Sequence, residues 1–330
     1  MPVLVTGGAG YIGSHMALAL LARGEPVVIL DNLSTGLRSL APRSACFVEG
    51  DVGDADLVRR LVIEHRIHEV LHFAASTVVP ESVAQPLAYY RNNTVASRML
   101  LEVCAEAGVR RFVFSSTAAI YGEVSSRLVD EAASPAPINP YGRSKLVTEW
   151  MLQDVAVATP LRFAALRYFN VAGADPLGRS GQSTPRATHL IKRACQVALG
   201  RLPCLGVFGV DYPTSDGTAI RDYIHVSDLV GAHILALDHL RNGGAPLILN
   251  CGYGRGFSVR DVIAAVERVA GVKLPLREMP RRAGDSAEVV ADSGRLRREL
   301  GWKPNYDDLD TIVRHALDWE RTLDPETAAA

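Results

Sequence analysis

Two side chains four residues apart, Tyr141 and Lys145, are the first pair that could do chemistry together. Residues 140–157 are expected to form a helix, and on a helix this spacing puts both side chains on one face. A lysine charge beside a phenol stabilises the phenolate and lowers the phenol's pKa towards neutrality, as a general base requires. Thr117, after a strand expected at 111–114, could hydrogen-bond a substrate hydroxyl or carbonyl. The same spacing also occurs by chance on surface helices, so its context decides.

A glycine-rich turn lies at the start of the chain. It follows a short aliphatic run typical of a buried parallel strand, and a helix-forming segment comes after it. Gly8-x-Gly10-x-x-Gly13 matches the dinucleotide fingerprint, and Gly7-x-x-Gly10-x-x-Gly13 matches its variant with a wider first spacing. Glycines let the backbone turn sharply near phosphates, and free N–H groups at the helix start meet their negative charge. The turn therefore predicts a site for a dinucleotide pyrophosphate.

An acidic residue follows at the right interval. A second strand is expected over 26–30 and ends at Asp31 and Asn32, about 20 residues past the glycines. A carboxylate there can accept hydrogen bonds from the adenosine ribose and would repel a 2′-phosphate, which favours NAD over NADP. The alternative is an aspartate that only caps the next helix.

The composition is that of an ordinary globular protein. The chain has 330 residues, of which 48% are hydrophobic and 22% charged, with a net charge of −1. This charge argues against a nucleic-acid or membrane-surface partner. A strand that starts at residue 3 leaves no room for a signal peptide, and no apolar run could span a bilayer, so a cytoplasmic location is expected. Five scattered cysteines predict buried free thiols and no metal site.

Strand and helix signals alternate through the first half. Strands are expected at 46–50, 70–75, 111–114 and 163–168, and helices at 56–66, 86–108 and 140–157. This alternation predicts an α/β fold with a Rossmann-type doubly wound parallel sheet, whose ligands gather at the carboxyl ends of the strands.

The alternation loosens near residue 172. We therefore expect an NAD-binding domain over 1–171 and a smaller α/β substrate-binding domain over 172–330, with some later segments returning to the first domain. Within the second domain, elements are expected at 200–205 and 259–270.

Over nearly its whole length the chain resembles the extended short-chain dehydrogenases/reductases and, within them, the UDP-glucose 4-epimerase family. The motifs that carry this resemblance lie at 6–15, 31–33, 49–52, 72–75, 114–117, 141–145, 167–170, 211–226 and 280–285. The last two belong to the nucleotide-sugar half and separate this group from short-chain reductases in general.

The resemblance implies an NAD-dependent isomerase that interconverts UDP-glucose and UDP-galactose. Tyr141 as phenolate takes the proton of the sugar 4-hydroxyl while hydride passes from C4 to NAD. Lys145 keeps the phenolate ionised and hydrogen-bonds the nicotinamide ribose, and Thr117 helps to shuttle the proton. The 4-keto sugar turns over and receives the hydride on its other face. NAD must stay bound, UDP is held tightly and the hexose loosely. A homodimer through helices 86–108 and 140–157 is also implied.

The resemblance also implies two sets of binding residues. Those near NAD are Gly7, Gly10, Tyr11, Ile12, Gly13, Asp31, Asn32, Asp51, Val52, Phe73, Ala74, Ala75, Asn93, Ser115, Tyr141, Lys145 and Tyr168. Those near the UDP-sugar are Thr117, Phe169, Asn170, His189, Leu190, Phe208, Arg221, Arg282, Asp285 and Val289. In the second set two arginines and an asparagine face the diphosphate and Asp285 the uridine ribose. Alternatively, the two arginines are surface ion-pair partners, and Asn93 is a solvent-facing helix residue.

Three positions depart from the family pattern. Thr77 stands where many members have a lysine near the cofactor, which puts one charge contact in doubt. His189 stands where an asparagine often contacts the substrate phosphates. Val289 occupies a pocket-wall position that varies between tyrosine and small side chains, so we hypothesise some tolerance of N-acetylated sugars.

Related chemistries are less well supported. A nucleotide-sugar 4,6-dehydratase needs an Asp and a Glu just after the threonine, and a UDP-glucuronate decarboxylase usually has a glutamate there, but this chain has Ala118 and Ala119. A 4-epimerase of UDP-pentoses or UDP-uronates stays open. So does a catalytically silent NAD-binding regulator, although such proteins commonly lose the Tyr/Lys pair, which this chain retains.

Overall fold

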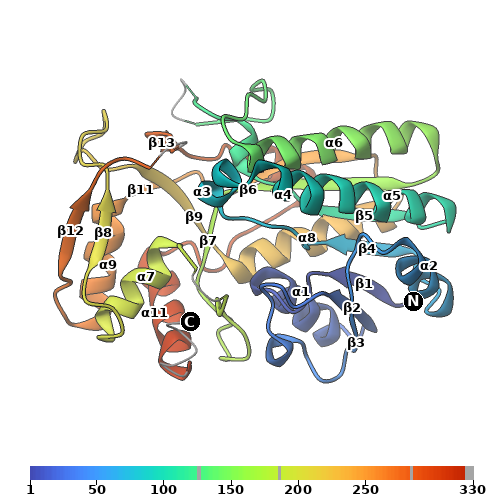
Figure 1. Ribbon diagram of the computed structural model, residues 1–330, viewed down its shortest axis with the longest axis horizontal. Coiled ribbons are helices and arrows are strands. Elements are labelled where there is room, and N and C mark those ends of the chain that lie inside the picture. Colours follow the sequence, from blue (N-terminus) through green and yellow to red (C-terminus); the bar gives the residue numbers. More distant parts are fainter. Residues whose placement is uncertain (125–127, 185–186, 283–284, 324–330) are drawn as a thin grey trace.

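The computed structural model describes residues 1–124, 128–184, 187–282 and 285–323. Its centre is a seven-stranded sheet in the order β10-β6-β5-β4-β1-β2-β3, in which every neighbouring pair is parallel (Figure 1). The strands are β1 (Val3–Thr6), β2 (Val27–Asp31), β3 (Cys46–Glu49), β4 (Glu69–His72), β5 (Arg111–Ser115), β6 (Arg162–Tyr168) and β10 (Leu247–Cys251). This sheet confirms the predicted Rossmann-type doubly wound fold.

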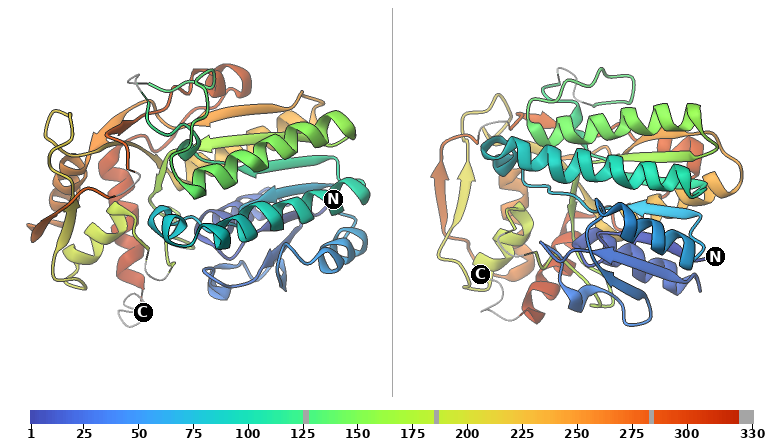
Figure 2. Two further views of the ribbon diagram at one scale, coloured as in Figure 1. Left: turned by 45° about the horizontal axis from the view of Figure 1, so that its top comes forward. Right: turned by 45° about the vertical axis from the view of Figure 1, so that its right-hand side comes forward.

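Helices cover both faces of the sheet, because its central strands are apolar on both sides. Figures 1 and 2 show the two layers, and the buried side chains divide into one core beneath each layer. The helices of one layer are α1 (Tyr11–Ala22), α8 (Val226–Arg241) and α10 (Gly294–Leu300). Those of the other layer are α2 (Ala55–Glu64), α5 (Ala96–Glu106) and α6 (Pro140–Ala158).

The helix expected at 86–108 is not uniform. After α3 (Val79–Ala84), the chain forms α4 (Pro86–Tyr89), a π-helical turn η2 (Tyr90–Val95), and then α5. A π turn inserts one extra residue per turn and changes which side chains share a face. Asn92 and Asn93, which are adjacent in sequence, both hydrogen-bond Ser76, in the loop after the carboxyl end of β4. The prediction of an uninterrupted α-helix was therefore wrong here.

A smaller part lies beyond the carboxyl ends of the strands, at the left of Figure 1. It holds a mixed sheet of β7 (Asn170–Ala172), β9 (Ile220–His225), β11 (Gly256–Ser258) and β13 (Glu288–Val289), and a pair, β8 (Leu205–Phe208) and β12 (Leu276–Met279). Around a core of their own pack α7 (Leu190–Ala198), α9 (Val259–Ala270) and α11 (Leu309–Thr322). Two short 3₁₀ turns belong to the larger part: η1 (Arg38–Leu40) follows β2, and η3 (Ala118–Ile120) follows β5.

Two expectations need correction here. The element expected at 200–205 is wrong, because Gly200 has a φ of +72° and the strand begins only at Leu205. Of the cysteines, which the sequence predicts to be buried, Cys46 is exposed and Cys204 is only partly buried.

The chain passes between the two parts more than once. β7 begins before residue 172 and already pairs with β9 of the small sheet, whereas α8 and β10 return to the large one. Within the described part of the chain, no helix has the length and apolarity needed to cross a membrane.

Candidate active site

A cleft of about 660 Å³ opens at the carboxyl ends of β1, β2, β4, β5 and β6, where the smaller part meets the large sheet. In parallel α/β sheets this edge is where ligands bind. Every residue that the sequence analysis assigned to a ligand lines this cleft, apart from Asn93, Lys145, Leu190, Phe208 and Arg282. The fold thus brings together side chains that are up to about 280 residues apart in the sequence.

The glycine turn forms a cradle that has no room for side chains. Gly7 has a φ of +70°, and a Cβ there would lie 2.6 Å from the backbone nitrogen of Ala74. A Cβ on Gly13 would overlap the carbonyl oxygen of Gly7. Gly10 precedes α1 without a side-chain cap, so N–H groups of the first helical turn are available to an anion. This cradle fits the pyrophosphate of a dinucleotide.

Three polar side chains form the far end of the cleft. Asp31 is buried, and its carboxylate accepts hydrogen bonds from the backbone nitrogens of Ala9, at 2.9 Å, and Leu33, at 2.8 Å. Asn32 donates to a carboxylate oxygen of Asp51 at 2.9 Å. Asp31 therefore braces the glycine turn as well as facing the cleft, and two carboxylates at this end disfavour an additional phosphate.

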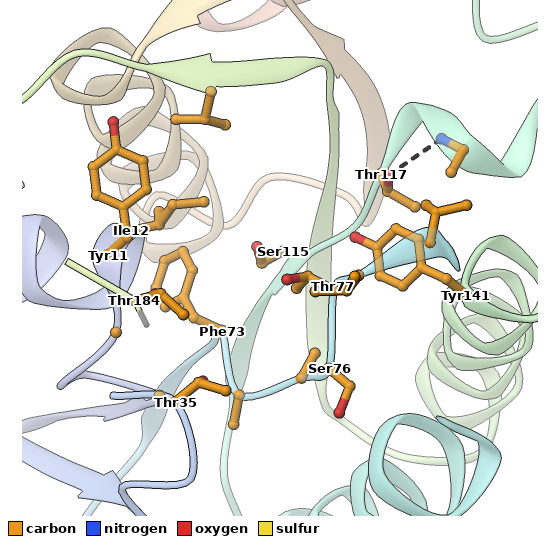
Figure 3. Close-up of a pocket in the computed structure, with 18 of the residues that line it drawn as sticks. Tyr11, Ile12, Thr35, Phe73, Ser76, Thr77, Ser115, Thr117, Tyr141 and Thr184 are labelled. Atoms are coloured by element: carbon orange, nitrogen blue, oxygen red, sulfur yellow. Dashed lines mark hydrogen bonds between the residues drawn. The ribbon is translucent and has the colours of Figure 1, made fainter. Parts of the chain in front are cut away.

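Local sequence fixes the position of the phenol. Asn139 caps α6 by accepting a hydrogen bond from the backbone nitrogen of Gly142 at 2.9 Å, and Pro140 occupies the first turn. Tyr141 is therefore held in the first turn of the helix. Its side chain and that of Thr117 point towards the same space in Figure 3. Thr117 Oγ1 accepts from the backbone nitrogen of Ala119 at 3.1 Å, and its hydroxyl hydrogen-bonds the Tyr141 side chain.

The structure corrects one expectation about the phenol. Burial raises the pKa of Tyr141 well above its ordinary value; Tyr168 adds to the rise, and the hydrogen bond with Thr117 opposes it. Lys145 is not what sets this pKa. The sequence predicts that the lysine charge lowers this pKa towards neutrality; in the structure the desolvation of the phenol is the larger effect.

Lys145 lies directly behind the end of β5 and does not line the cleft. Its Nζ donates to the carbonyl oxygen of Ser115 at 2.9 Å and lies 4.8 Å from the centre of the Phe114 ring. Burial lowers the pKa of this ammonium to about 7, and the nearby Glu149 partly opposes the shift. On the cleft side, the Ser115 hydroxyl donates to the hydroxyl of Tyr168 at 2.8 Å.

The opposite wall comes from the smaller part. Arg221 on β9 donates to the carbonyl oxygen of Ser286 at 2.7 Å and lies 3.8 Å from Asp285. Val289 on β13 is its register partner across the strand pair. The wall thus combines one arginine with an acidic neighbour, so the ion pair considered for Arg221 exists, yet both groups still face the cleft.

The predicted residues that do not line the cleft lie just outside it. Arg282 stacks on the ring of Phe208, with 3.8 Å from its guanidinium carbon to the ring centre. Leu190 lines a small adjoining cavity of about 30 Å³. Asn93 is buried and grips both backbone groups of Ser76, so it supports the cleft from behind and is not a solvent-facing residue.

Sequence reasoning missed several polar residues of the cleft wall. These include Thr35, Ser76, Asn92, Gln182 and Thr184. They lie in loops or in the π turn, where no periodic pattern marks them. Only the Asn92-Asn93 pair carried a signal, because two adjacent asparagines inside a helical segment are unusual helix formers.

Comparisons with known proteins agree with this geometry. Residues 3–252 match the NAD dependent epimerase/dehydratase family, and the chain belongs to that family. A UDP-glucose 4-epimerase of Azospirillum brasilense is 57% identical over 328 residues, which are 99% of this chain and 94% of that protein.

Solved structures give the same result. UDP-glucose 4-epimerase from Brucella ovis, in complex with NAD, has 47% identity and a TM-score of 0.93 over 96% of this chain and 97% of its own. The enzyme of that name from Stenotrophomonas maltophila, with bound NAD and formylated UDP-arabinopyranose, has 44% identity and a TM-score of 0.93 over 97% and 98%. These likenesses confirm the predicted resemblance, the cofactor NAD and the class of enzyme, an epimerase and hence an isomerase.

Proposed function

We propose that this protein interconverts UDP-glucose and UDP-galactose by transient oxidation at C4 of the sugar. The observation that carries the proposal is the meeting of Tyr141 and Thr117 in one cleft with the glycine cradle on one side and Arg221 on the other. The cradle serves a dinucleotide, and the arginine serves a second phosphate-bearing ligand. Relatives that bear the name UDP-glucose 4-epimerase support this substrate pair.

Residues of this chain handle the proton. When bound, NAD supplies a hydride acceptor and a positively charged nicotinamide ring. The Tyr141 oxygen accepts the proton of the sugar 4-hydroxyl, and the Thr117 hydroxyl, which hydrogen-bonds Tyr141, turns to donate to the same sugar oxygen. Positive charge near the phenol favours the phenolate and so opposes the effect of burial on its pKa. Lys145 contributes such a charge from behind the strand end. The same proton returns to the sugar oxygen at the end of the cycle.

The two halves of the cleft divide the binding. In our proposal the 1–171 part, completed by α8 and β10, holds NAD, and the remainder of 172–330, joined by Phe169 and Asn170 where the chain enters β7, holds the UDP-sugar. Arg221 and Asn170 bind the diphosphate, with His189, Phe169 and Asp285 beside them. Arg282 and Phe208 would join them only after a change at the cleft edge, because the arginine is now stacked on the ring.

The direct test is an assay of purified protein with UDP-galactose, UDP-N-acetylgalactosamine, UDP-arabinose and a UDP-uronate in separate reactions. We expect UDP-glucose from the first, and NAD to be released when the protein is denatured. Turnover of UDP-arabinose or a UDP-uronate alone would instead support an epimerase of another UDP-sugar. Protein that carries NAD but converts none of these sugars would indicate a silent NAD-binding regulator.

Val289 sets the width of the sugar end in our proposal. It lines the cleft on the short strand β13, and valine leaves more room than a large aromatic side chain. We expect turnover of UDP-N-acetylglucosamine, and loss of that turnover in Val289→Tyr with UDP-galactose still converted. Conversion of UDP-glucose with none of the N-acetylated sugar by the unaltered protein would contradict this.

We also propose a homodimer formed through α4, α5 and α6. Leu87 is 80% exposed, Trp150 54% and Val157 91%, although all three are apolar. These helices pack side by side along one edge of the molecule (Figure 2), and a second copy would cover their apolar surface. Sedimentation velocity should show a dimer that Trp150→Glu weakens; a monomeric unaltered protein would contradict it.

Five unpaired cysteines support a reducing, cytoplasmic location.

A further inference from the structure

A buried carboxylate lies behind the cleft and has no part in the chemistry described so far. Glu149 is on α6, one helical turn beyond Lys145, and its side chain is 1% exposed. Charged side chains are rarely buried this deeply unless they are paired and hydrogen-bonded. The carboxylate must therefore be explained by its partners.

One partner belongs to the catalytic strand end. The hydroxyl of Ser116 donates to Glu149 Oε1 at 2.5 Å. Ser116 stands between Ser115, whose carbonyl oxygen receives Lys145, and Thr117, whose side chain faces the cleft. Fixing Ser116 from behind therefore fixes both neighbours, because a turn of the backbone at this residue would move each of them.

The second partner balances the charge. Arg167 on β6 donates to both carboxylate oxygens, with 2.6 Å between its Nη2 and Oε2, and the arginine side chain is 6% exposed. Arg167 also donates to the hydroxyl of Tyr121 at 3.0 Å, and that hydroxyl donates to Asn250 at 2.7 Å. On this side the network ends in two neutral side chains, Tyr121 and Asn250. On the other side, the charge of Glu149 acts on Lys145.

We propose that Glu149 is a positioning residue for the epimerase reaction, one that clamps the strand end 115–117 through Ser116 and places a negative charge one helical turn from Lys145. This inference rests on the function proposed above. Without the carboxylate, the buried cation of Arg167 would stand uncompensated.

Other ionisable groups also surround Lys145. Glu149 on α6 and His72 on β4 act on it directly. Tyr141 on the same helix, Arg167 and Tyr168 on β6 and Tyr89 on α4 are the ionisable groups next to these partners or to the phenol. Burial lowers the pKa of His72 to about 3, so this ring is neutral at working pH. Among these groups Glu149 is the carboxylate that opposes the desolvation of Lys145.

Two substitutions separate charge from shape. Glu149→Gln keeps the shape and removes the charge, so Lys145 should lose its proton more easily and the alkaline limb of the kcat–pH profile should move to lower pH. A shift of one unit lowers kcat about tenfold on that side. Glu149→Asp keeps the charge but is too short for Ser116; we expect lower kcat at every pH with the limb unmoved.

Ser116→Ala serves as the third variant and leaves the ion pair with Arg167 intact. We expect a lower kcat, an unchanged KM and an unmoved limb. A wild-type kcat in Ser116→Ala would overturn the role of Glu149 in clamping the strand end. This test does not depend on whether Glu149→Gln folds.

A Glu149→Gln protein that retains NAD and whose kcat falls equally at all pH values would overturn the role towards Lys145 and leave a structural one. The unaltered protein is assayed in parallel. If it converts no UDP-sugar, the proposed function fails by itself, whereas a failure confined to the variants concerns Glu149 alone.

Discussion

The catalytic side and the substrate side of the cleft are built in different ways. Thr117, Tyr141 and Lys145 are 7%, 6% and 3% exposed and stand just after β5 or in the first turns of α6, two elements packed in the main core. By contrast, Arg221 and Val289 stand on a pair of strands of which one has two residues, and Asp285, 38% exposed, lies in a loop. Proton transfer requires fixed geometry. A 4-keto sugar that presents first one face and then the other to the hydride requires a wall that accepts more than one orientation. The chain places each task on the matching kind of support.

The largest effect is expected from Gly13→Val, which acts on the rigid side. A side chain at this position overlaps the carbonyl group of Gly7, so the cradle cannot keep its shape. We expect loss of bound NAD, measured in the supernatant of denatured protein, and with it loss of epimerase activity. Gly231→Val is the matched control, because Gly231 also lies in a helix without a positive φ, but nothing lies within 4 Å of its added Cβ. Retained NAD in Gly13→Val would mean that the turn is not the cofactor cradle.

Tyr141→Phe removes the proposed base and leaves the packing of the ring. General-base contributions of about 10²–10⁴-fold give the expected fall in kcat, with bound NAD unchanged. Tyr212→Phe is the control in the smaller part, because its buried hydroxyl has no hydrogen-bond partner within the described part of the chain. Activity of Tyr141→Phe close to that of the unaltered protein would remove Tyr141 from the reaction.

Arg221→Met tests the adaptable side. Hydrogen bonds to a charged group contribute about 1.5–3 kcal/mol, so KM for UDP-galactose should rise about 10–100-fold while kcat changes little. Arg260→Met, which breaks only an exposed pair with Glu278, should leave both constants unchanged. If kcat falls in Arg221→Met and KM does not, the division between the two sides is wrong.

The smallest effect concerns stability. Burial holds the pKa of Lys145 at about 7, below its ordinary 10.5. Between these values the unfolded chain binds more protons than the folded one, so this residue makes the free energy of unfolding rise with pH over that range. Lys145→Met removes the contribution.

The free energy of unfolding of Lys145→Met should exceed that of the unaltered protein by the largest amount near pH 6. This difference should shrink by about 1–3 kcal/mol towards pH 10, as measured by urea unfolding. Arg221→Met, on the partly exposed wall, should show no such trend. A constant difference between Lys145→Met and the unaltered protein would mean that Lys145 is not desolvated in the folded state.

The sequence by itself determined the large sheet, the glycine cradle and the candidate catalytic residues. These features depend on local patterns: strands buried on both faces, glycines at the positions where a Cβ does not fit, and an Asn-Pro start to the helix that carries Tyr141. Signals of this kind are encoded within a few residues, so they can be read without the fold.

Only the tertiary structure decided how the remaining parts meet. It showed that α8 and β10 pack with the large sheet and that a π turn lets both Asn92 and Asn93 hydrogen-bond Ser76. It also showed that Lys145 donates to the carbonyl oxygen of Ser115 and not to the phenol. It also joined Glu149 to Ser116, across 33 positions of sequence, in a buried ion network. Desolvation and pairing depend on which distant groups are packed together, and no local pattern of residues encodes that.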